Sequence, residues 1–84
     1  MSTTRQTAPL DDWLKIADDK ETVLVSHDSI YPVGVYVGAT APDINSAYHR
    51  CTASRPFSMG GVSGVDVYIR SLTTAAVDVT VTAV

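Results

Sequence analysis

The sequence predicts an all-β fold: a small antiparallel β-sandwich or barrel of six to eight short strands. Three observations support this fold class. Valine and threonine, which are β-branched and fit a pleated, half-buried surface, occur twelve and ten times, whereas leucine occurs four times. Apolar and polar residues alternate with a period of two in the most regular segments, as they do in half-buried strands. Clusters of glycine, proline, asparagine and aspartate separate these segments at short intervals.

The chain of 84 residues is predicted to form one domain with a short extension. Residues 1–10 are assigned to a flexible N-terminal arm and residues 11–84 to a single β-sandwich domain. The opening letters "MSTTRQTA" are polar and lack periodicity, which is typical of a frayed terminus or of an arm that a partner orders. A domain of this size buries a small core, so we expect added stability from association with other subunits.

The segment "PLDDWLKIADDKE" permits two interpretations. An amphipathic helix is suggested by four apolar residues at helical spacing and by acids near the start. These apolar residues are Leu10, Trp13, Leu14 and Ala17. Alternatively, residues 12–17 form a strand, which the polar turn "DDKE" joins to a second strand at residues 22–26 as a hairpin. The strand is favoured, and Trp13 is expected to anchor the core.

The middle of the chain predicts one regular strand and two short ones. In "VGVYVG" at residues 33–38, valines form one face, while two glycines flank Tyr36 on the other. Glycine inside a strand often marks a bulge or a close approach by another backbone. Short strands are expected at residues 48–52 and 56–59, and the glycines that follow indicate a turn-rich loop.

The C-terminal segment "VDVYIRSLTTAAVDVTVTAV" is predicted to form two strands that each have one dry face. In the first strand Val65, Val67 and Ile69 alternate with polar residues. In the second strand the same pattern runs through Val77, Val79, Val81 and Ala83. We expect the short segment "SLTTAA" to join them as a hairpin with a single register, because a slip of one residue would expose the valines.

Charge and hydropathy argue against two classes of partner. The net charge is −3, from nine acids and six bases, and the bases are scattered along the chain. Without a basic stripe, nucleic-acid binding is not expected. No apolar run has the length of a membrane span, and the N-terminus lacks the apolar stretch of a secretory signal. The chain is therefore expected to be made and kept soluble in a cytoplasm, with no membrane partner.

The chemically reactive side chains do not suggest a catalytic, metal or cofactor site. Cys51 is the one cysteine, and His27 and His49 are the two histidines, without a metal-binding cluster. Cys51 and His49 share a face of a strand, which suits a nucleophile pair, but we favour the interpretation of Cys51 as a small buried residue. Four acids have the chemistry of a metal-binding pair or a glycosidase couple, but we favour their interpretation as a solvated edge. These acids are Asp11, Asp12, Asp18 and Asp19. The protein is not predicted to be an enzyme.

The tyrosines are the best candidates for a binding surface, because tyrosine is enriched at interfaces. The candidate interface residues are Tyr31, Tyr36, Tyr48 and Tyr68, with Arg5 in the arm. A different class of function remains open: a carbohydrate- or receptor-binding module in which Tyr31, Tyr36 or Tyr48 stacks on sugar rings. The polar residues near Tyr48 for such a site are Asp43, Asn45 and Arg50.

Two long segments together carry a family resemblance. They are "DWLKIADDKETVLVSHDSIYPVGVYVGATAPD" and the C-terminal "VDVYIRSLTTAAVDVTVTAV", with a glycine-rich loop before the second. This combination of an early tryptophan, a "V.V..G..AP" stretch and a closing Val/Thr pair of strands resembles the small all-β structural proteins of tailed bacteriophages. The residues that match are Trp13, residues 33–37, Gly38, Ala41, Pro42, residues 67–70 and residues 77–82. The intervening "YHRCTASRP" is less typical.

The resemblance implies a virion structural protein. A capsid decoration or cement protein, a head-fibre base and a tail-associated module are the forms expected. It implies partners of two kinds: further copies of the chain, in a homo-oligomer that is expected to be a trimer, and capsid or other virion proteins. The implied location is the virion, assembled in the host cytoplasm.

Overall fold

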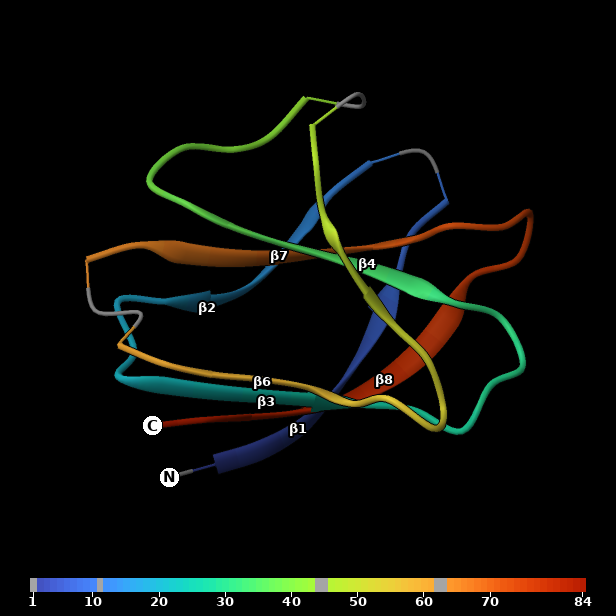
Figure 1. Cartoon of the computed structure of the whole chain (residues 1–84), viewed down its shortest axis with the longest axis horizontal. Coiled ribbons are helices and arrows are strands. Elements are labelled where there is room, and N and C mark those ends of the chain that lie inside the picture. The colour runs from blue at the N-terminus through green and yellow to red at the C-terminus, as the bar shows by residue number, and fades with distance from the viewer. Residues whose placement is uncertain (1, 11, 44–45, 62–63) are drawn as a thin grey trace.

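The computed structural model describes residues 2–10, 12–43, 46–61 and 64–84 and confirms the all-β fold class. These residues form eight strands, which lie in two antiparallel four-stranded sheets (Figure 1). The strands are β1 (Ser2–Ala8), β2 (Leu14–Asp18), β3 (Thr22–Ser26), β4 (Val33–Gly38), β5 (His49–Cys51), β6 (Phe57–Gly60), β7 (Asp66–Ser71) and β8 (Val77–Ala83). The described part of the chain contains no helix, and so none that is long and apolar enough to cross a membrane.

The strand order is that of an eight-stranded jelly roll. Sheet I has the order β1-β8-β3-β6, and sheet II has the order β2-β7-β4-β5. Four antiparallel pairs, β1 with β8, β2 with β7, β3 with β6 and β4 with β5, are those of one long hairpin folded back on itself. Two further pairs, β3 with β8 and β4 with β7, close this hairpin into two sheets.

The two predicted local hairpins are wrong. β2 and β3 belong to different sheets, and so do β7 and β8, so each short connection crosses from one sheet to the other. The alternation of apolar residues determines which face of a strand is buried. Both arrangements bury that face: consecutive strands paired in one sheet, and consecutive strands that face each other across the core. The pairing of distant strands in the long hairpin decides which arrangement forms.

The N-terminal segment also differs from the prediction of a flexible arm. Residues 2–8 form β1, an edge strand that pairs with β8 from Ser2↔Ala83 to Ala8↔Val77. A main-chain ladder holds this polar segment, because β8 would otherwise present unpaired N–H and C=O groups along its edge. The strand interpretation of residues 12–17 is confirmed by β2, which has a register shift between Lys15 and Ala17.

The core lies between the two sheets and consists mostly of the inward-facing valines that the alternation predicted. β8 has the burial pattern of a half-buried strand, with alternate residues buried and exposed. Each buried valine or isoleucine side chain stabilises the fold by about 1.5–3 kcal/mol relative to its exposed state. The buried core cluster contains Ala8, Ala17, Val23, Val25, Val33, Val35, Cys51, Val67, Ile69, Val77, Val79 and Val81.

Candidate functional site

Four aromatic rings gather on the outer face of sheet II. The ring centroids of Trp13 and Tyr36 are 6.1 Å apart, those of Trp13 and Tyr48 6.4 Å, and those of Tyr36 and Tyr68 6.3 Å. The guanidinium carbon of Arg70 lies 5.8 Å from the Trp13 ring centroid. These separations are typical of tilted aromatic pairs and of a cation–π contact. We call this surface, Trp13, Tyr36, Tyr48, Tyr68 and Arg70, the aromatic platform.

The pairing of strands explains why these side chains meet. Tyr36 of β4 lies directly opposite Tyr68 of β7, so both rings are on the face of sheet II that points away from the core. Trp13 precedes β2, which pairs with the other side of β7, and Tyr48 precedes β5, which pairs with the other side of β4. The platform therefore draws residues from all four strands of the sheet or their immediate flanks.

Two glycines of β4 allow the rings to lie close to the sheet. A Cβ atom on Gly34 would be 2.9 Å from Leu72 Cδ2 and 3.1 Å from Tyr48 Cδ1. A Cβ atom on Gly38 would be 2.7 Å from Cε1 and Oη of Tyr36. The sequence indicated a close approach at these positions, and the approaching groups are side chains, largely aromatic, rather than another backbone.

The platform is partly open to solvent. Tyr48 keeps 47% of its surface exposed and Tyr68 only 7%, while Trp13 and Tyr36 are half-buried. The Trp13 indole N–H donates a hydrogen bond of 2.9 Å to the main-chain oxygen of Asp43. The expectation that Trp13 anchors the core is therefore wrong, because this residue packs on the outside of sheet II and ties the β4–β5 loop to the platform.

Charged groups border the platform beside Tyr68. Lys15 Nζ lies 3.6 Å from an oxygen of Asp18 and 3.7 Å from an oxygen of Asp66. Asp66, and to a lesser extent Asp18, raises the pKa of Lys15. The Tyr68 hydroxyl donates a 3.4 Å hydrogen bond to Asp66. Burial first, and then the charge of Asp66, raises the pKa of Tyr68. At neutral pH, Lys15 is therefore a cation and Tyr68 a neutral hydrogen-bond donor.

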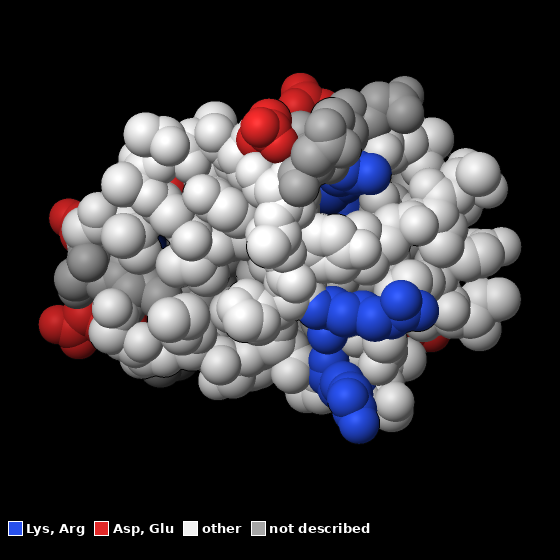
Figure 2. All heavy atoms as spheres, turned by 45° about the horizontal axis from the view of Figure 1, so that its top comes forward, with Lys and Arg blue, Asp and Glu red and all other residues white. Residues whose placement is uncertain are grey.

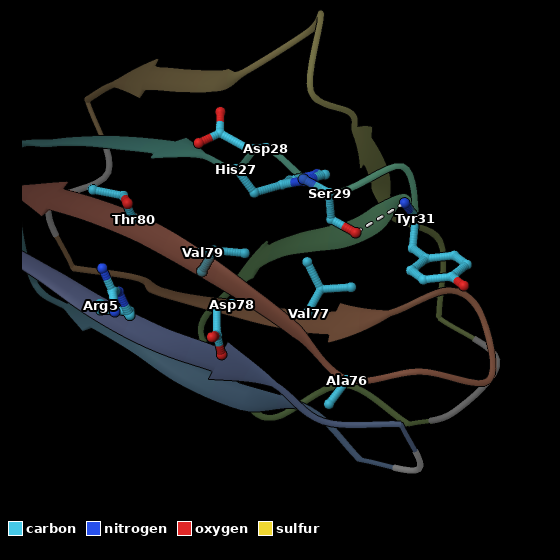
Figure 3. Close-up of a pocket in the computed structure, with 10 residues that line it drawn as sticks. All are labelled: Arg5, His27, Asp28, Ser29, Tyr31, Ala76, Val77, Asp78, Val79 and Thr80. Atoms are coloured by element: carbon cyan, nitrogen blue, oxygen red, sulfur yellow. Dashed lines mark hydrogen bonds between the residues drawn. The ribbon is translucent and has the colours of Figure 1, made fainter.

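Tyr31 and Arg5 do not join the platform. Both line a groove of about 370 Å³ beside β8, at the point where β3 ends (Figure 3). Figure 3 shows Tyr31 at one end of this groove and Arg5 at the other. The Tyr31 N–H donates to Ser29 Oγ at 3.0 Å. The five predicted interface residues therefore divide into a group of three on sheet II and a pair at the groove.

His27 fixes the loop that forms one wall of the groove. Its Nδ1 accepts a 3.2 Å hydrogen bond from the main-chain N–H of Ser29, so the other ring nitrogen carries the proton. That Nε2 donates to the main-chain oxygen of Cys51 at 3.1 Å. The ring is buried and links the groove wall to β5.

The reactive side chains considered in the sequence are not brought together. The Cys51 thiol is buried and donates to the Val25 oxygen at 3.7 Å, and burial raises its pKa. His49 instead packs its ring 5.7 Å from that of Phe57. Among the acids, Asp18 faces Lys15, Asp19 accepts a hydrogen bond from the Gly64 N–H, and Asp11 lies outside the described residues. No group of three or more metal-ligating residues occurs in the described part of the chain.

The structure describes two of the three polar residues that were expected to accompany Tyr48 in a sugar site. Arg50 lies opposite Gly34 in the β4–β5 pair, on the same face of sheet II as the platform. The main chain of Asp43 is bonded to Trp13, as described above. Asn45 lies outside the described residues. A shallow cavity of about 160 Å³ opens beside Tyr36 and Tyr48.

Sequence reasoning missed Trp13 and Arg70 as members of this surface. Arg70 lies two residues after Tyr68 in β7, so alternation places both on the same face. Trp13 lies just before β2 and two residues before the exposed Lys15, so alternation places it on the face of Lys15. Strand parity was therefore a usable signal for both. Figure 2 shows one face of the molecule, on which Lys and Arg atoms form small separate groups among mostly uncharged residues.

No protein-family model, curated protein or solved structure matches this chain.

Proposed function

We propose that the protein is a structural component of a tailed-bacteriophage virion that acts by docking onto other proteins. In this proposal it is a capsid decoration or cement protein, or a head-fibre or tail-associated protein. It works as a homo-oligomer, with a trimer as the expected stoichiometry, and it is located in the virion after assembly in the host cytoplasm. The jelly-roll strand order supports the proposal, since viral capsid domains commonly have this fold. Because a fold alone does not assign a function, we infer the docking role from the residues of the surface.

The single observation that carries the proposal is the aromatic platform. Aromatic residues and arginine are the side chains that most often dominate the energy of protein interfaces. Here they form a contiguous surface on a rigid sheet, with Arg70 beside Trp13 and Tyr48 47% exposed. Rings that are already packed against one another lose little conformational freedom when a partner covers them. On a symmetric particle, repetition of such contacts converts modest affinities into firm attachment.

The test is quantitative mass spectrometry of purified particles produced by the genome that encodes this chain. We expect the protein in many copies per particle. Its absence from particles would overturn the proposal. The role of the platform is tested separately with Tyr48→Ser, which removes the most exposed ring of the platform. The matched control is Tyr31→Ser at the groove, where the ring is 41% exposed.

The two variants give opposite expectations for the platform. Tyr48→Ser should reduce incorporation into particles at least tenfold, which corresponds to about 1.4 kcal/mol of binding energy. Tyr31→Ser should be incorporated as the unmodified protein is. The reverse pattern would leave the virion assignment standing and move the docking surface to the groove.

A second candidate function is carbohydrate binding, which one observation favours. The exposed Tyr48 ring lies beside Trp13 and a shallow cavity of about 160 Å³, and jelly rolls also serve as lectin domains. Trp13 is the one tryptophan of the chain, so its fluorescence reports directly on this surface. A glycan that binds there should change Trp13 emission in the unmodified protein but not in Tyr48→Ser. A glycan array without binding would remove this candidate.

A further inference from the structure

The edge strand β1 is held by its main chain much more than by its side chains. All seven of its residues pair with β8, in an unbroken register from Ser2↔Ala83 to Ala8↔Val77. Ala8 is nevertheless the one buried side chain among residues 3–8, and Gln6 is half-buried. The remaining side chains, Thr3, Thr4, Arg5 and Thr7, are exposed. Detaching β1 therefore uncovers little apolar surface of its own.

β8, by contrast, requires a neighbour at this edge. It is an interior strand of sheet I, and Val77, Val79 and Val81 on its inner face are buried. Without β1 it would become an edge strand with a row of unpaired N–H and C=O groups. Such an edge is a template for another strand, and the strand that fits it best is one with the same sequence as β1.

The side chains of β1 and β8 favour this particular sequence over an unrelated strand. Thr3 Oγ1 lies 2.8 Å from Thr82 Oγ1, and Thr7 Oγ1 donates to Asp78 at 2.8 Å. Arg5 lies opposite Thr80, and Figure 3 shows Arg5 of β1 beside Asp78 of β8. A second copy of β1 would form the same hydrogen bonds in the same register.

The connection between β1 and β2 is suited to a change of partner. β1 lies in sheet I and β2 in sheet II, so β1 packs in a different sheet from the strand that follows it. Pro9 restricts the backbone at the start of this connection. The Pro9 oxygen accepts a 2.8 Å hydrogen bond from the Ser71 N–H, so exchange of β1 gives up this single bond while the β1–β8 ladder is kept.

From these observations we propose that two copies of the chain associate by exchanging β1, so that each β1 pairs with β8 of the other copy. All bonds of the β1–β8 pair are then retained, and the closed and the exchanged forms differ in the connection between β1 and β2. Exchange of an identical element is a low-cost route to a dimer. The inference does not depend on the virion assignment, because it concerns the purified chain alone.

A disulfide across the register tests the exchange. Thr3 and Thr82 are directly opposed with touching side chains, so Thr3→Cys with Thr82→Cys places two thiols within the reach of a disulfide. The background is Cys51→Ala, which removes the natural thiol. Equal amounts of ¹⁴N- and ¹⁵N-labelled protein are unfolded together, refolded at high concentration, oxidised and digested. Mass spectrometry then identifies the isotopes of the two peptides in each disulfide.

We expect covalent dimers whose disulfide joins peptides of different isotope, in a fraction that rises with protein concentration. Linked peptides of one isotope only, from monomers at every concentration, would overturn the proposal. So would the absence of any link, since it would show that β1 and β8 are not paired in this register in solution. The control is Thr3→Cys with Thr80→Cys. Thr80 lies on the same face as Thr82 but two residues away from the position opposite Thr3, so this pair should not form the disulfide.

A variant of the connection gives an independent check on the same protein. Insertion of a short Gly-Ser segment after Leu10 lengthens the connection between β1 and β2 without altering the paired residues. We expect a loss of the exchanged dimer in light scattering, with Trp13 emission unchanged. An unchanged or larger dimer fraction would contradict a form that is stabilised by the short connection.

Discussion

The outer faces of the two sheets are built from the same strand alternation but have different chemistry. On sheet I the outward positions are occupied mainly by threonine and serine, as in the directly paired Thr3 and Thr82. On sheet II they are occupied by the aromatic platform and by the glycines beneath its rings. On the outer face of sheet I, the polar side chains form hydrogen bonds with neighbouring side chains or with water. The outer face of sheet II collects aromatic area that is only partly covered, and so is the face better suited to a partner.

The largest expected effect lies in the core that both faces share. Ile69 of β7 is fully buried directly behind the platform, between residues that face outward. Ile69→Ala should lower the free energy of unfolding by about 2–5 kcal/mol, because it leaves a cavity in a small core. Thr80→Ala on the outer face of sheet I should change it by less than about 0.5 kcal/mol. Urea denaturation of the two variants measures the difference, and equal losses would contradict this placement of the core.

A smaller effect should distinguish the glycines of the two sheets. Gly38→Ala places a Cβ where the Tyr36 ring lies, so the ring must move away from Trp13 and Tyr68. We expect a loss of about 1–2 kcal/mol and a shift in Trp13 emission. Gly60→Ala in sheet I is the control, because its Cβ would meet only Thr22 Cγ2 at 3.7 Å. If Gly60→Ala were the more disruptive variant, the platform would not lie on these glycines.

The pH dependence of the free energy of unfolding should also distinguish the two faces, because Tyr68 and Lys15 both lie on the outer face of sheet II. The folded-state pKa values of Tyr68 and Lys15 are both raised above their unfolded values. Their contributions to stability are therefore complete below the unfolded pKa values and are lost as the pH rises through the folded ones, above about pH 10. Tyr68→Phe should lose less stability than the unmodified protein over this range. The difference in tyrosinate absorbance between the two proteins should appear above the pH at which an ordinary tyrosine ionises.

The smallest expected effect is on the outer face of sheet I. Thr82→Val removes the exposed hydrogen bond between the Thr3 and Thr82 hydroxyls and keeps the β-branched shape. The free energy of unfolding should change by less than about 0.5 kcal/mol, because water replaces the lost bond. Thermal unfolding by circular dichroism measures the change. A loss of several kcal/mol would mean that this face is as tightly integrated as sheet II.

Strand alternation was sufficient to predict which residues lie inside. The burial of Val67, Ile69 and the valines of β8, and the outward position of Tyr36 and Tyr68, follow from a period of two. Alternation carries no information on which strands are neighbours, and for this reason both local hairpins were wrong. Which sheet a strand belongs to depends on pairing between strands far apart in the chain. Among the pairs of described strands, β4 with β5 is the one in which the two strands are consecutive in sequence.

The remaining errors have a shared physical cause. β1 was interpreted as an arm because its side chains are polar, but an edge strand is held by main-chain bonds that side-chain hydropathy does not report. Trp13 was placed in the core because it is large and apolar, yet its indole N–H finds a partner in the Asp43 oxygen on the outside of sheet II. In both cases hydrogen bonds to the main chain outweighed the tendency that composition suggested.

The direct pairing of Ser2 with Ala83 has a consequence for how the molecule reaches its native state. β8 stands between β1 and β3 in sheet I, so neither of these earlier strands meets that shared neighbour until residues 77–83 have been synthesised. Loop-closure entropy must be overcome before such distant contacts contribute, and topologies of this kind fold slowly for their length. Of the pairs in sheet I, only β3 with β6 can therefore form before β8 is made, and a fragment truncated before Val77 leaves the first and third strands unjoined.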